Sequence, residues 1–175
     1  IASYRDTRVY DPLFRAITTI SSKKGLFNGH YFINWLSDLF VEKLRLTNLG
    51  EGLSDKELKY LALHLSFADL DEAKWVEGSH AGEKAFKDLR VVATDLNHSS
   101  SVRFSSVLTP NASVIDAVRA SMSYPVAFKP HRYKDIYWKD GIRKKRIKKG
   151  WENIDLIDGG VMDNYPVRAF DEEDD

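Results

Sequence analysis

The chain has 175 residues, of which 43% are hydrophobic and 30% charged, a globular composition that excludes an intrinsically disordered chain. Its 26 basic and 26 acidic residues balance, so the overall charge indicates no polyanionic partner, and only local clusters can do so. The absence of cysteine excludes disulfides, thiolate metal sites and a cysteine nucleophile. No apolar run approaches the ~20 residues of a membrane span, so we expect a cytoplasmic protein that contacts membranes only peripherally.

The N-terminal half of the chain predicts two helices. Apolar residues recur at helical spacing over 29–45, and Asn28 is the expected N-cap. Ser54 and Glu57 have the spacing of a capping box, which predicts the start of a second helix. The charged segment 69–88 is expected to form a loop or a short helix.

The C-terminal half predicts four strands and one further helix. Short apolar or β-branched runs indicate the strands 89–94, 102–107, 133–138 and 154–157. The first two are expected to form a hairpin. Between the second and third strands, Ser113 and Asp116 again have a capping spacing, and they open a helix that reaches Met122. Helices that alternate with buried strands predict one α/β layered domain over residues 1–175.

A carboxylate and a pair of glycines follow the last predicted strand. They are Asp158, Gly159 and Gly160. Glycines permit backbone angles and close approaches that a side chain would prevent, so they can hold a carboxylate at a strand end beside a pocket. Asp-Gly is also common in ordinary turns, and these three residues alone favour a turn.

The longer string, in which Asn164-x-Pro166 follows Asp158-Gly159-Gly160, resembles the catalytic aspartate motif of the patatin-like phospholipases. Three further stretches resemble segments of that family in the same order. They are residues 25–29, residues 91–96 with 104–105, and residues 109–110 with 117–125. The resemblance implies a three-layer α/β/α domain, of which this chain corresponds to the C-terminal half.

The resemblance also implies a Ser–Asp dyad that hydrolyses acyl esters of membrane phospholipids or other acyl lipids. A serine in a Gly-x-Ser-x-Gly elbow would attack the ester carbonyl, and Asp158 would accept its proton directly. Gly159, Gly160, Asn164 and Pro166 would support the aspartate loop. The family requires no cofactor, and the five histidines show no spacing typical of a metal site.

Two parts of this machinery are missing from the sequence. It contains no Gly-x-Ser-x-Gly string. The most similar stretch of the sequence is residues 78–82, which has His80 at its centre and is expected to be a loop. It also shows no glycine-rich oxyanion segment. Because the chain begins with Ile1 and not with Met, we expect a truncated domain, incomplete at both ends, whose nucleophile lies upstream. The alternative is a catalytically inactive lipid-binding or regulatory module with the same fold.

Six of the seven residues from 143 to 149 are basic, and aromatic residues flank them on both sides. The six are Arg143, Lys144, Lys145, Arg146, Lys148 and Lys149. Such a run, which looks like an insertion relative to the family, can contact an anionic lipid surface, where each cation contributes ~1 kcal/mol. An alternative is a solvated hairpin tip that turns at Asp140-Gly141. Nucleic-acid binding is a third use of such a run, and we do not expect it here.

Overall fold

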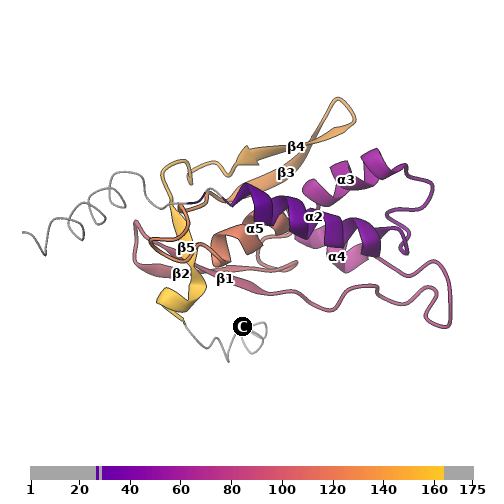
Figure 1. Cartoon of the computed structure of the whole chain (residues 1–175), viewed down its shortest axis with the longest axis horizontal. Helices are drawn as coiled ribbons and strands as arrows, with labels where there is room; N and C mark the ends of the chain where they lie inside the picture. The colour runs from indigo at the N-terminus through magenta and orange to yellow at the C-terminus, as the bar shows by residue number, and fades with distance from the viewer. Residues whose placement is uncertain (1–26, 28, 164–175) are drawn as a thin grey trace, which may run out of the picture.

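The computed structural model of the protein describes residue 27 and residues 29–163, and Figure 1 shows their arrangement. The helices are α2 (His30–Leu44), α3 (Asp55–Leu63), α4 (Phe67–Glu72), α5 (Val114–Ser121) and the short 3-10 helix η1 (Gly159–Val161). The strands are β1 (Val91–Asp95), β2 (Ser100–Phe104), β3 (Lys134–Lys139), β4 (Ile142–Ile147) and β5 (Leu156–Asp158). The predictions for Asn164 and Pro166 fall outside the described residues.

The predicted helices form, and local signals account for where they begin. Helix α2 starts after Gly29, whose φ of 73° suits a glycine, so Gly29 is the N-cap in place of the expected Asn28. The capping box of α3 is confirmed, because the Ser54 hydroxyl accepts from the Glu57 amide and the Glu57 carboxylate accepts from the Ser54 amide.

Helix α4 is stabilised by a second capping box, which the sequence interpretation did not identify. The Asp69 carboxylate accepts from the Ser66 amide at 2.7 Å, and the Ser66 hydroxyl accepts from the Asp69 amide at 3.2 Å. The segment after α4 is irregular up to β1. The segment 69–88 was expected to form a loop or a short helix. The end of the short helix α4 occupies its first residues, and loops form the rest.

Strand β1 is the centre of a three-stranded sheet with the order β2-β1-β5, and both of its pairings are antiparallel. All five of its residues are buried, as predicted for an apolar β-branched run. Val91 and Ala93 belong to the main hydrophobic core, together with Phe104 of β2 and Leu156 of β5. The predicted hairpin of the first two strands is confirmed, with the turn between Asp95 and Ser100.

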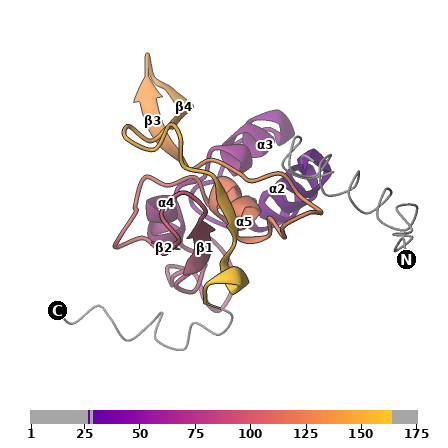
Figure 2. The ribbon, with the colours of Figure 1, turned by 90° about the vertical axis from the view of Figure 1, so that its left-hand side faces the viewer.

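The helices stack on this sheet in a defined order. Helix α5 contacts β1 and β5, α2 contacts α5, and α3 contacts α2. Figures 1 and 2 show α5 beside the strands and α2 and α3 further from them. The chain is therefore an α/β domain, as predicted, with antiparallel strands.

Strands β3 and β4 form a separate two-stranded hairpin that projects from the body of the molecule (Figures 1 and 2). Its turn is Asp140-Gly141, and both residues have positive φ, 54° and 72°, as a tight two-residue hairpin turn requires. The hairpin turn predicted at Asp140-Gly141 is therefore confirmed. The tip of the hairpin and η1 lie at opposite ends of the molecule in both views.

Candidate active site

Asp158 is held at the end of β5 by hydrogen bonds on both its backbone and its side chain. It pairs with Ala93 of β1, and its amide donates to the carbonyl of Ser123 at 3.1 Å. Its Oδ1 accepts from the amide of Gly160 at 2.7 Å, so the carboxylate caps the first turn of η1. The strand end and the turn together fix the direction of this carboxylate.

Gly159 is required by packing in this turn. It is buried, and a Cβ on it would lie 2.4 Å from the carbonyl oxygen of Val92 in the neighbouring strand β1. No side chain fits at that distance, so only glycine lets the chain pass so close to β1. This explains physically why a glycine follows the aspartate.

Asp158 lies on the wall of an open cavity of about 490 Å³ between β1, α5 and η1. The residues that line it are Leu89, Arg90, Val91, Val92, Val118, Ser121, Asp158, Gly159, Gly160 and Asp163. Its volume falls in the range of small-molecule sites, and aliphatic side chains form much of its wall. A half-buried carboxylate beside such a wall can accept a proton from a group bound in the cavity.

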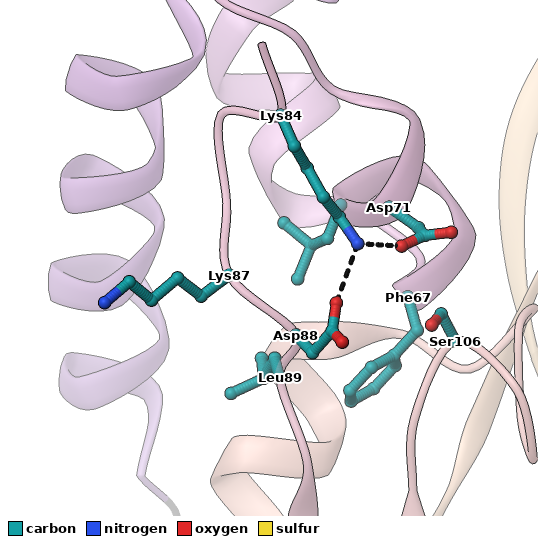
Figure 3. Close-up of a pocket in the computed structure, with 8 residues that line it drawn as sticks. Phe67, Asp71, Lys84, Lys87, Asp88, Leu89 and Ser106 are labelled. Atoms are coloured by element: carbon teal, nitrogen blue, oxygen red, sulfur yellow. Dashed lines mark hydrogen bonds and ion pairs between the residues drawn. The ribbon is translucent and has the colours of Figure 1, made fainter. Parts of the chain in front are cut away.

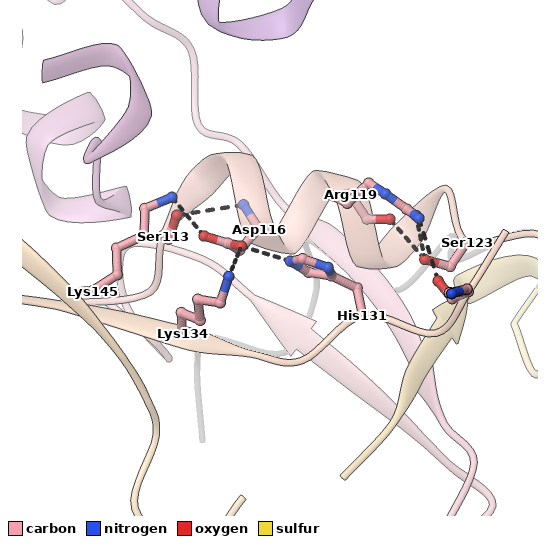
Figure 4. A network of polar contacts seen from close by, with 8 residues as sticks. Ser113, Asp116, Arg119, Ser123, His131, Lys134 and Lys145 are labelled. Atoms are coloured by element: carbon pink, nitrogen blue, oxygen red, sulfur yellow. Dashed lines mark hydrogen bonds and ion pairs between the residues drawn. The ribbon is translucent and has the colours of Figure 1, made fainter. Parts of the chain in front are cut away.

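Arg119 of α5 supports the loop that receives the Asp158 amide. Its side chain is buried, and its Nη1 donates to the Ser123 hydroxyl at 2.7 Å (Figure 4). The guanidinium lies 4.9 Å from the ring of Phe128 and directly against Gly29, the start of α2. Burial lowers the pKa of Arg119. Sequence reasoning missed this residue, although a cation between Val118 and Ala120 in an apolar helix was a visible signal.

A family model described as "Patatin-like phospholipase" matches residues 3–171. The chain belongs to the patatin-like phospholipase family. A search of curated proteins and a search of solved structures each returned no significant match.

A buried ionic cluster ties α5 of the patatin-like domain to the β3–β4 hairpin. Asp116 is only 2% exposed, and its carboxylate accepts from His131 Nε2 at 2.6 Å, Lys134 Nζ at 3.1 Å and Lys145 Nζ at 2.6 Å (Figure 4). Burial alone would raise the pKa of Asp116, but the hydrogen bond from His131 and the charges of Lys145 and Lys134 lower it well below its usual range. The sequence indicated Asp116 only as a capping residue.

The basic run 143–149 divides between the two faces of β4. Arg143 forms a bidentate pair with Asp69 of α4, at 2.5 Å and 2.7 Å, and Lys145 pairs with Asp116. Lys144 and Arg146, on the opposite face of the strand, are exposed. Half of the cations within β4 thus hold the fold together, which the linear run did not reveal.

Ion pairs hold two other places identified by sequence or by shape, the loop 78–82 and a small hollow beside α4. Residues 78–82 form turns, as predicted, and His80 pairs with the nearby Glu83 at 3.0 Å. Figure 3 shows a second hollow, in which Lys84 contacts the carboxylates of Asp71 and Asp88. Its volume of about 10 Å³ accommodates no more than one water molecule.

None of the helices in the part of the chain that the structure describes combines the length and the apolar character needed to cross a bilayer.

Proposed function

We propose that this patatin-like domain is the base-bearing part of a lipid acyl hydrolase in which Asp158 and a serine form the catalytic dyad. The observation that carries the proposal is the position of Asp158: at a strand end, fixed by the Gly160 amide, on the wall of a cavity that is partly lined by aliphatic side chains. The family match supports a lipid substrate. The proposal places the serine outside these 175 residues. It also assigns a three-layer α/β/α arrangement to the complete patatin-type domain.

In this mechanism Asp158 acts as general base and then as general acid. Its Oδ1 is occupied by the Gly160 amide, whereas Oδ2 receives no hydrogen bond from the other described residues. Oδ2 is therefore the atom we assign to the serine proton. The serine attacks the ester carbonyl to form an acyl-enzyme, and Asp158 returns the proton to the departing alcohol. In the second step Asp158 deprotonates the water that releases the fatty acid.

The cavity walls suit the acyl part of such a substrate. Val92 of β1 and Val118 of α5 line it beside Asp158, and Leu89 extends the aliphatic surface. Hydrocarbon buried against these side chains contributes about 0.8 kcal/mol per CH₂ group. The aliphatic part of the lining therefore suits an acyl chain, and Arg90, Ser121 and Asp163 supply polar groups to the rest of the cavity.

The test is Asp158→Asn in the protein that carries the serine, assayed on a soluble nitrophenyl ester. An amide keeps the shape of the side chain but cannot accept the serine proton, so we expect turnover to fall by ~10²–10⁴-fold with the fold intact. Asp163→Asn is the matched control, because Asp163 lines the same cavity and is not part of the proposed dyad. Near-normal turnover of Asp158→Asn would show that the aspartate is structural.

A second candidate function, an inactive lipid-binding or regulatory module, is favoured by one observation: the 175 residues contain no Gly-x-Ser-x-Gly string. A serine-directed fluorophosphonate distinguishes the two. Labelling that requires a serine elsewhere in the protein supports the hydrolase. Labelling of a serine within these residues, of which Ser121 lines the cavity, would assign the nucleophile differently.

A further inference from the structure

The tip of the β3–β4 hairpin exposes large apolar side chains. Trp138 is 65% exposed and Ile142 is 48% exposed, one on each side of the Asp140-Gly141 turn. The hairpin projects from the body (Figures 1 and 2), and the pairing of β3 with β4 places both residues at its turn end. Contiguous exposed apolar surface, more than any single exposed side chain, marks an interaction site.

Behind this tip, an apolar groove of about 640 Å³ separates the hairpin from α3. Its main lining residues are Leu53, Tyr60 and Leu61 on the α3 side and Trp138, Ile142 and Arg143 on the hairpin side. The Tyr60 hydroxyl donates to the carbonyl of Arg143, a contact that joins the two walls. The volume falls in the range of sites that bind small molecules.

Lys56 and Glu57 on the α3 side also line this groove, whereas the charged side chains of the hairpin around it are positive. On the inner face of β4, Arg143 and Lys145 are neutralised by Asp69 and Asp116. On the outer face, Lys144 and Arg146 are exposed, and Lys139 is exposed at the end of β3. Within the described residues these three cations form no ion pair; Arg146 lies over the ring of Tyr137, at 5.0 Å. The tip therefore combines a free positive charge with an apolar groove.

We propose that the hairpin tip and the groove behind it form a docking site for an anionic lipid bilayer. Trp138 and Ile142 enter the head-group region, one acyl chain occupies the groove, and Lys139, Lys144 and Arg146 contact lipid phosphates. The choice of a bilayer over an acidic protein rests on the proposed function, because the substrate of a lipid hydrolase resides in a membrane. Binding itself requires no turnover, so it can be measured separately.

This site is distinct from the candidate active site. The hairpin tip and η1, which follows Asp158 directly, lie at opposite ends of the molecule (Figures 1 and 2). The tip is therefore a tether and not the mouth of the Asp158 cavity. Loss of vesicle binding without loss of soluble-ester turnover in the serine-bearing protein would identify a defect in the tether alone.

Co-sedimentation of the 175-residue chain with phosphatidylserine/phosphatidylcholine vesicles tests the proposal. Lys144→Gln combined with Arg146→Gln should weaken binding roughly 30-fold, since each cation near an anionic surface contributes ~1 kcal/mol. The matched control is Lys74→Gln with Lys87→Gln, which removes the same charge from two exposed positions outside the hairpin and should bind like the wild type. Far-ultraviolet circular dichroism confirms that each variant is folded.

A second measurement reports on the tip itself. Lipids brominated in the acyl chain should quench the fluorescence of the wild type, and Trp138→Phe should remove most of that quenching while retaining binding. Wild-type-like binding by the Lys144/Arg146 variant, or an equal loss in the Lys74/Lys87 control, would overturn the proposal. Equal binding to phosphatidylcholine alone would do the same, as would binding of RNA with no binding of vesicles.

Discussion

The turn that presents Asp158 depends on a single missing side chain. Gly159 passes so close to β1 that a Cβ would lie 2.4 Å from the Val92 carbonyl oxygen. We therefore expect Gly159→Ala to reduce the free energy of unfolding by about 1–3 kcal/mol, as overpacked substitutions do, because β5 must move away from β1. The same movement displaces Asp158 and should lower ester turnover by the proposed Ser–Asp dyad in the serine-bearing protein. Urea unfolding and ester hydrolysis measure the two effects.

Gly78→Ala is the comparison for that variant. Gly78 has φ of 87°, and a methyl group at this position would have no heavy atom within 4 Å, so the substitution strains the backbone without any clash. It should cost about 1–2 kcal/mol of stability and leave turnover unchanged, because Gly78 lies in the loop between α4 and β1. Equal turnover losses in both variants would mean that the contact with Val92 is not what positions Asp158.

At the scale of elements, strand β4 allows a matched test of what its cations do. Arg143→Gln with Lys145→Gln removes the inner pair and leaves Asp69 and Asp116 with fewer partners, so we expect a loss of roughly 3 kcal/mol in the free energy of unfolding. Lys144→Gln with Arg146→Gln removes the same charge from the outer face and should change stability by less than about 0.5 kcal/mol. Thermal unfolding compares them, and equal losses would contradict the assigned faces.

The sequence could not assign those faces, because the run Arg143-Lys144-Lys145-Arg146 places cations on both sides of the strand whichever way it is paired. A one-residue shift of register exchanges the two sets. The register is fixed instead by the two-residue turn at Asp140-Gly141, which was predictable, and by carboxylates that lie 74 and 29 residues away in the chain. Those distant partners have no local sequence signal.

Signals between residues that are close in sequence predicted individual helices and strands correctly. The Ser54 and Glu57 pair predicted the start of α3, and the β-branched run predicted β1, because the atoms involved are neighbours in sequence. The box formed by Ser66 and Asp69 has the same spacing, but it carries Asp in place of the usual Glu or Gln, so its signal is weaker. The strand that ends at Asp158 was predictable, whereas the contact with Ser123 and the cavity depend on tertiary packing.

For the whole molecule, the pKa of Asp116 makes stability depend on pH. In the folded state this pKa lies well below the unfolded value of ~3.9, so the stabilisation is complete above about pH 4 and is lost progressively as the pH falls below it. Asp116→Asn should be less stable by about 3–5 kcal/mol at pH 7, because Lys134 and Lys145 lose their carboxylate. The difference from the wild type should shrink below about pH 4.

Urea unfolding from about pH 2 to pH 7 measures that difference. Asp140→Asn is the control, because Asp140 is an exposed turn residue at which asparagine is equally suitable. It should follow the wild-type curve. A constant difference between Asp116→Asn and the wild type across the whole range would show that the carboxylate titrates normally in the folded protein.

Because the hairpin tip lies far from η1 (Figures 1 and 2), the proposal predicts which end of the bound molecule contacts the bilayer and which end stays in water. The chain has no cysteine, so a single introduced thiol can carry an environment-sensitive dye at a chosen position. A dye on Ile142→Cys should shift to shorter emission wavelengths when anionic vesicles are added. A dye on Met162→Cys, which is exposed directly after η1, should keep the emission it has in water. A tethered molecule would then hold the η1 end of its Asp158 cavity away from the surface that anchors it.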